Sequence, residues 1–93
     1  MDKRICTLAH NLVNYSCKVR EGDKVYIHYI GKDTSDLARA LIREVYAAKG
    51  LPFVHYTDTK VQREQLMNCT PEQLTLMAKW DCEEMSAMDC YIG

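Results

Sequence analysis

Residues 24–56, KVYIHYIGKDTSDLARALIREVYAAKGLPFVHY, predict a strand, a helix and a second strand in immediate succession. The segment Lys24–Ile30 is rich in β-branched and aromatic side chains, and the short run Phe53–Tyr56 has the same character. Between them, apolar residues recur at helical spacing from Asp36 to Lys49. Such a unit almost always crosses over right-handedly, so we expect the two strands to be parallel neighbours.

The two ends of this central helix carry recognisable stop signals. We expect Asp33, Thr34 or Ser35 to cap its start, because a short side-chain oxygen accepts a free N–H of the first turn. At the other end, Gly50 stands where a helix commonly ends in the left-handed conformation. Pro52 then keeps the helix from resuming.

A helix is also expected before this unit, from about Lys3 to Cys17. Its buried stripe is expected to consist of Ile5, Leu8, Ala9, Leu12 and the Tyr15/Ser16 region. Gly22 then allows a turn into the first strand, because glycine adopts positive φ without a steric penalty.

Two further helices are expected after the unit. The segment Thr57–Asn68 suggests a short helix, and Thr70 with Pro71 marks the start of a second that runs toward Met88. This last helix carries Trp80 and several methionines, a stripe that is typical of a core and also suits a partner-binding face. Residues 89–93 then open a third strand.

This order of elements predicts the fold class. It fits an α/β fold, a three-layer open parallel sheet with helices on both faces, because the first strand is apolar on both sides. Residues 1–93 are expected to form a single α/β domain that is truncated at the third strand. A strand that closes a sheet seldom ends after two or three apolar residues, so we expect this to be the N-terminal part of a longer chain.

Composition excludes several classes of protein. Apolar residues make up 47% and charged residues 27% of the chain, and the formal net charge is -1. These values are those of an ordinary globular domain, and they predict neither a nucleic-acid nor a membrane partner. The five cysteines form no C-x-x-C pair, which favours reduced thiols and a cytoplasmic location.

Charge is unevenly distributed along the chain. Basic residues outnumber acidic ones over residues 1–32, whereas acidic residues dominate from Glu72 onward. Such asymmetry pairs surfaces either within one fold or between subunits.

Nucleotide-binding motifs are incomplete. The loop after the first strand has only Gly31, so the G-x-G-x-x-G pattern of dinucleotide folds is missing. Gly31-Lys32 is similar to the end of a phosphate-binding P-loop, but Tyr26 replaces the first glycine and Asp33 replaces the final Ser or Thr. We therefore expect no phosphate site, and no catalytic or metal-binding set is evident.

One polar cluster is a candidate site. His28 and His55 belong to the two neighbouring strands and Asp58 follows the second. The carboxyl edge of a parallel sheet is where ligands usually bind, so these residues could form part of a metal or acid–base site. The alternative is that strand histidines simply bond to neighbouring polar groups.

Several stretches resemble a known family. Residues 12–16 (LVNYS), 19–25 (VREGDKV), 37–41 (LARAL), 44–46 (EVY) and 90–93 (CYIG) are similar to the start of the thermophilic-type metallo-aminopeptidases. This is the aminopeptidase T and aminopeptidase S group, also described as leucyl-aminopeptidase-like. The resemblance extends over essentially the whole chain.

The resemblance implies a function for the longer protein. Members of the family remove N-terminal residues from peptides with two divalent metal ions, zinc or cobalt, which a C-terminal catalytic domain holds. The resemblance thus implies no cofactor in this chain, a non-catalytic N-terminal role, a partner in its own catalytic domain, and a homodimer. Two alternatives stay open: a stand-alone dimerisation module and a small-ligand-binding module.

Overall fold

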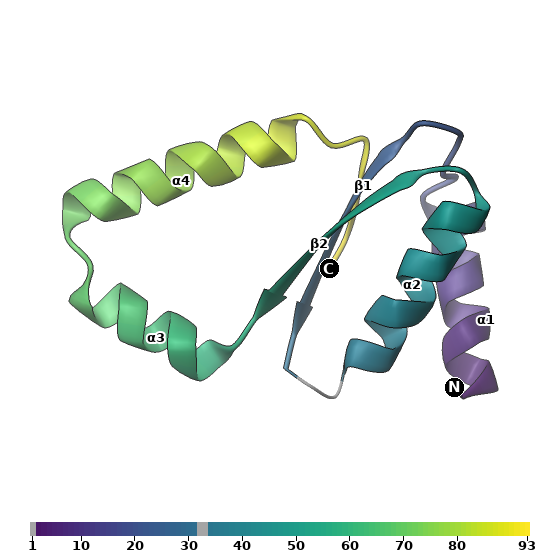
Figure 1. The fold of residues 1–93 in the computed structure, drawn as a ribbon, viewed down its shortest axis with the longest axis horizontal. Coiled ribbons are helices and arrows are strands. Elements are labelled where there is room, and N and C mark those ends of the chain that lie inside the picture. The colour runs from purple at the N-terminus through teal and green to yellow at the C-terminus, as the bar shows by residue number, and fades with distance from the viewer. Residues whose placement is uncertain (1, 32–33) are drawn as a thin grey trace.

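The structure, a computed structural model, describes residues 2–31 and 34–93 and has an open parallel sheet (Figure 1). The strand order is β2-β1-β3, and all pairings are parallel. This confirms the expected α/β open sheet and the expected pairing of the first two strands. The elements are α1 (Lys3–Asn11), a π-helical turn η1 (Leu12–Ser16), β1 (Lys24–Ile30), α2 (Ser35–Ala47), β2 (Leu51–Thr57), α3 (Thr59–Asn68), α4 (Pro71–Ser86) and β3 (Cys90–Ile92).

The middle strand β1 has unequal neighbours. It pairs with β2 along its whole length, but with β3 only over Val25–Ile27. The bounds of β1 agree with the prediction, whereas β2 is longer than the predicted Phe53–Tyr56. Pro52 lies inside β2, where it is tolerated because β2 is an edge strand.

Burial is confined to the first half of the chain and to one face of the sheet. On this side α2 packs against β1 and α1 packs against α2, and side chains of all three join one buried cluster. No residue from 51 to 93 is buried. The buried apolar residues are Ala9, Val13, Val19, Val25, Ile27, Ala38, Ala40, Leu41 and Val45.

The N-terminal helix differs from its prediction in two ways. It changes to π-helical geometry at Leu12, where the N–H of Cys17 donates to the Leu12 carbonyl at 2.9 Å. Its buried residues are Ala9 and Val13, whereas Leu8 is 48% and Tyr15 69% exposed. The predicted stripe was therefore wrong at Leu8 and Tyr15, because the helix presents positions four residues apart to α2.

The start of α2 does not use the predicted cap. The Thr34 hydroxyl donates to the Ile30 and Gly31 carbonyls at 3.0 and 3.1 Å, and Thr34 makes no side-chain bond to the first turn. Ser35 is the first helical residue, and Asp33 lies outside the described residues. The hydroxyl of Thr34 thus closes the turn after β1 instead of capping the helix.

The predicted left-handed conformation of Gly50 is also wrong. The left-handed residue is Lys49, with φ of 66°, and Gly50 follows it. A Cβ atom on Gly50 would lie 2.8 Å from Val19 Cγ1 and 3.0 Å from Val45 Cγ1. Glycine is required here because the backbone approaches the core closely, not because of its dihedral angles.

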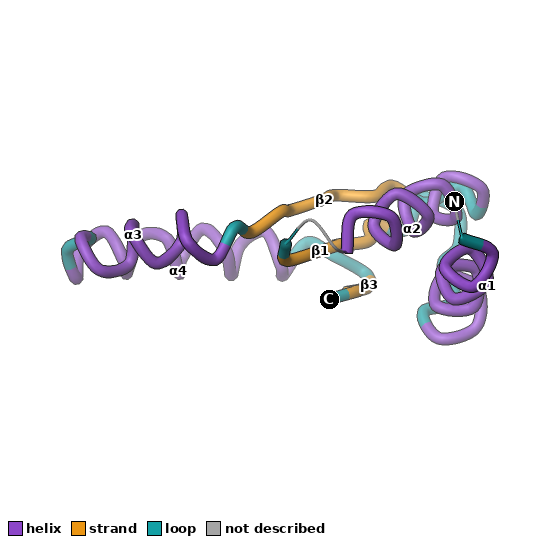
Figure 2. The backbone as a smooth tube through the Cα atoms, turned by 90° about the horizontal axis from the view of Figure 1, so that it is seen from below, coloured by secondary structure: helices purple, strands orange, loops and turns teal. Residues whose placement is uncertain are grey.

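Helices α3 and α4 form an arm, residues 59–86, that extends past the sheet (Figure 2). The predicted cap is confirmed, since the N–H of Gln73 donates to the Thr70 hydroxyl at 3.1 Å. No arm residue is buried, and Leu74 and Trp80 are 49% and 59% exposed. The interpretation of the α4 stripe as core is therefore wrong within this chain, because only the C-terminal end of α4 reaches the second face of the sheet. No described helix has the length and apolarity that crossing a membrane requires.

The third strand is attached to β1 by a reciprocal pair of hydrogen bonds. The Lys24 N–H donates to the Asp89 carboxylate at 2.8 Å, and the Asp89 N–H donates to the Lys24 carbonyl at 2.8 Å. The ion pairs in the described part of the chain do not join the basic first third to the acidic last third. They are His10–Glu44, Asp36–Arg39 and His55–Glu84.

Gly50→Ala tests the close approach at the end of α2. The added Cβ overpacks Val19 and Val45, so we expect the free energy of unfolding to fall by about 1–3 kcal/mol. Urea denaturation measures this. Gly93→Ala is the matched control, since nothing lies within 4 Å of its Cβ. Equal stability of the two variants would contradict the packing argument.

Candidate functional site at the uncovered sheet face

The second face of the sheet carries aromatic and histidine side chains. Side chains alternate along a strand, and Val25 and Ile27 point into the core, so their neighbours point to the other side. We call this surface the open face: Tyr26, His28, Phe53, His55 and Tyr91. The register places His28 directly opposite His55, and it aligns Tyr26 with both Phe53 and Tyr91.

Each candidate histidine has a polar partner. His28 Nε2 lies 2.7 Å from the Thr57 hydroxyl oxygen. His55 Nε2 bonds to the Glu84 carboxylate of α4, and the His55 ring stacks on Tyr26 with centroids 4.9 Å apart. The two histidines thus lie side by side, as the sequence suggested, and both are already engaged.

Asp58 takes a different position. Its carboxylate caps α3, accepting from the N–H groups of Lys60 at 2.9 Å and Val61 at 3.2 Å. The acid beside His55 is Glu84 instead, which lies 29 positions along the chain. No local signal marks Glu84 as a partner, because only the path of the arm brings it back to the sheet.

The acidic end of α4 also affects Tyr26. Partial burial, followed by the negative charges of Glu84 and Asp81, raises the pKa of the Tyr26 phenol. Next to it, the Tyr91 hydroxyl donates to the Met85 carbonyl. Tyr26 therefore stays protonated at neutral pH. The His55–Glu84 bond and the Tyr91–Met85 bond together attach the arm to the open face.

The metal ions that the sequence resemblance implies would need several His, Cys, Asp or Glu ligands close together. Residues 2–31 and 34–93 contain no group of three His, Cys, Asp or Glu side chains that could hold a metal ion. His28 and His55 approach each other, but the carboxylate of Asp58 is bonded to the first turn of α3. The donor set of the described residues thus does not fit a two-metal centre.

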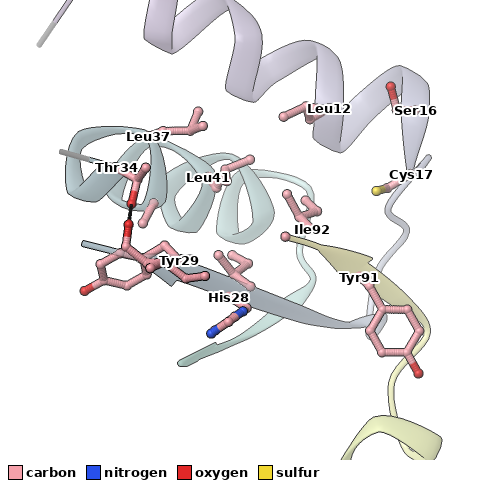
Figure 3. Close-up of a pocket in the computed structure, with 14 residues that line it drawn as sticks. Leu12, Ser16, Cys17, His28, Tyr29, Thr34, Leu37, Leu41, Tyr91 and Ile92 are labelled. Atoms are coloured by element: carbon pink, nitrogen blue, oxygen red, sulfur yellow. Dashed lines mark hydrogen bonds between the residues drawn. The ribbon is translucent and has the colours of Figure 1, made fainter. Parts of the chain in front are cut away.

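A groove of 520 Å³ lies on the helix side of the sheet (Figure 3). Apolar side chains from η1, α2, β1 and β3 dominate its lining, including Leu12, Leu37, Leu41 and Ile92. The described residues that line the groove are mostly apolar, so they offer mainly apolar contact.

The sequence matches a model of a known protein family. The family model described as "Thermophilic metalloprotease (M29)" matches residues 1–91. The chain belongs to this family. The sequence resemblance to the metallo-aminopeptidases is thereby confirmed at the level of the family.

A solved structure has a similar fold. Wild-type AmpT from Thermus thermophilus superposes with a TM-score of 0.60 and 21% sequence identity, over 75% of this chain. The matched part is 18% of the AmpT chain, so the present chain spans a minor part of that protein's length. No curated protein sequence matches the chain.

Removal of the bond between His55 and Glu84 tests how the arm is attached. Trp80 is the only tryptophan and lies on α4, so its fluorescence anisotropy reports motion of the arm. We expect His55→Ala to lower the anisotropy, while unfolding stability changes by at most about 1 kcal/mol because the pair is exposed. Glu83→Gln, one residue from Glu84, is the control. Unchanged anisotropy in His55→Ala would show that the bond does not hold the arm.

Cys90 gives a pH dependence of stability. Burial, followed by a hydrogen bond with the Cys17 thiol, raises the pKa of Cys90 from 9.0 to about 12. Between pH 9.0 and about 12 the folded chain keeps the Cys90 proton, whereas the unfolded chain loses it. The contribution of Cys90 to the free energy of unfolding is therefore complete below pH 9.0 and falls as the pH rises. We expect the pH-dependent loss of unfolding free energy to be smaller in Cys90→Ser. A loss as steep as in the parent chain and in Cys82→Ser would contradict this origin.

Proposed function

We propose that this chain is the non-catalytic N-terminal α/β domain of a metal-dependent aminopeptidase, a protein that hydrolyses N-terminal residues from peptides. The observation that carries the proposal is the family match over residues 1–91. It is supported by the described side chains, which form no metal-binding group of three, and by the small share of the AmpT chain that the domain covers.

In this proposal the catalytic domain holds the metal ions, two divalent ions such as zinc or cobalt. The present domain contributes surfaces for its own C-terminal catalytic domain. The open face and the arm suit that role, because both expose apolar and aromatic side chains that the chain itself does not cover. Phe53, Tyr91 and Trp80 are 41%, 49% and 59% exposed.

A second candidate is a homodimerisation module in the cytoplasm. It is favoured by the edge position of β3, which within the described residues pairs with β1 alone. Exposed strand edges pair readily with another chain. This candidate predicts a concentration-dependent dimer that a proline in Tyr91→Pro abolishes, as sedimentation would measure.

The third candidate, a small-ligand module, would use His28 and His55 on the open face. It predicts a rise in melting temperature with a nucleotide, a metal ion or an amino acid. The domain proposal predicts no such rise, because both histidines are already bonded.

An activity assay tests the main proposal. Residues 1–93 are expected to show no hydrolysis of an aminoacyl-nitroanilide with Zn²⁺ or Co²⁺, because no described residues form the metal centre. Full-length AmpT, part of which has a fold similar to this chain, is assayed alongside as the reference. Metal-dependent turnover by residues 1–93 alone would overturn the non-catalytic role.

A further inference from the structure

Two exposed parts of the molecule carry opposite charge. Residues 3–20, which include α1 and η1, have four basic side chains and no acidic one: Lys3, Arg4, Lys18 and Arg20. Helix α4 has one basic side chain, Lys79, against four acidic ones: Glu72, Asp81, Glu83 and Glu84. Surfaces of opposite charge attract each other and suppress pairing with like-charged surfaces, so the two segments are electrostatically complementary.

These charges are not paired with one another within the chain. In the part of the chain that the structure describes, the ion pairs include none of the four bases, and among the acids of α4 they include Glu84 alone. Figures 1 and 2 place α1 and α4 at opposite ends of the molecule, with the sheet between them. The acidic helix therefore does not reach the basic one of the same chain, whereas it is free to reach that of a second copy.

One side of α4 combines apolar and acidic side chains. Glu72, Leu76, Trp80 and Glu83 follow one another at intervals of four, four and three residues, so they lie on the same side of the helix. Leu76 and Trp80 are 40% and 59% exposed. This stripe has an apolar centre between two carboxylates, which is the arrangement of an interface core with a polar rim.

The outward side of α1 has the complementary arrangement. It forms a shallow hollow of about 610 Å³, lined by Asp2, Lys3, Arg4, Thr7, Leu8 and Asn11. Arg4, Leu8 and Asn11 are spaced four and three residues apart, and Leu8 is 48% exposed. When the two helices lie antiparallel with Glu83 beside Arg4, Trp80 comes to lie beside Leu8.

We propose that two copies of the chain pair through these surfaces, with α1 of each copy receiving α4 of the other. Every copy carries both surfaces, so a two-fold axis makes the same contact twice and closes the assembly. Charge complementarity selects a second copy as the occupant. The contact is separate from the β3 edge, and it does not depend on the role proposed above for the domain in a peptidase.

Sedimentation equilibrium of the chain tests the proposal. We expect a dimer whose dissociation constant rises roughly tenfold between about 0.05 M and about 0.5 M NaCl, because salt screens exposed charges. Trp80 is the only tryptophan, so its emission reports the contact directly. The emission should shift to shorter wavelength as the dimer forms, since Leu8 of the other copy then covers the indole ring.

Charge reversal gives the sharper test. One variant combines Lys3→Glu with Arg4→Glu, and a second combines Glu72→Lys with Glu83→Lys. Each should be monomeric alone, because side chains of like charge then meet at both contacts. An equimolar mixture of the two variants should dimerise again, because α1 of each variant then has the charge opposite to that of α4 in the other.

A reversal elsewhere on the arm is the matched control. Lys60→Glu combined with Arg63→Glu changes two bases of α3 and should leave the dimer intact. The proposal is overturned if the parent chain stays monomeric at low salt, if either charge-reversed variant dimerises as the parent does, or if their mixture stays monomeric. None of these outcomes bears on the hydrolysis assay, so the failure of the dimer and the failure of the domain proposal are distinguishable.

Discussion

The buried cluster that α1 and α2 form with one face of β1 is the interaction on which the rest of the structure depends. Val13, Val25, Ile27 and Val45 are the largest fully buried side chains. Each buried side chain of this kind contributes about 1.5–3 kcal/mol of transfer free energy. Every buried apolar residue lies between Ala9 and Val45, so the first half of the chain holds the only dry core that the described residues form.

The second half is held to that core mainly by polar and backbone bonds, with Cys90 and Ile92 of β3 packing against its edge. Strand β2 is attached by the ladder to β1, β3 by the Asp89–Lys24 pair, and the arm by bonds through Glu84 and Met85. Such hydrogen bonds fix the orientation of the elements they join, but each adds little to the net free energy of unfolding. The exposed aromatic residues of the open face and the arm are consistent with a domain that presents these surfaces to a larger partner, as proposed for a peptidase domain.

The sequence predicted those elements whose signals are local. The apolar, β-branched run Lys24–Ile30 and the Thr70-Pro71 start of α4 are decided by neighbouring residues, and both were predicted correctly. The role of Gly50 was misjudged because it depends on Val19 and Val45, which are distant in sequence. Likewise, the apolar stripe of α4 signals burial only if a surface is available to cover it.

The candidate site was predictable to the same extent. Strand pairing placed His28 opposite His55, but the pairing of His55 with Glu84 depends on the path of the arm. Asp58 was singled out for its place after a strand, whereas its position before α3 made it a helix cap. An aspartate directly before a helix readily accepts from the free N–H groups of the first turn, and Asp58 does so instead of joining the two histidines.

Native-state hydrogen exchange, followed for individual amides, tests most directly the claim that stability is confined to one face of the sheet. The account predicts that amides of β1 and α2 exchange only by global unfolding, while those of α3 and most of α4 exchange through low-energy local opening. Equal protection of the arm and of β1 would contradict it, because the arm would then share a cooperative core with the sheet.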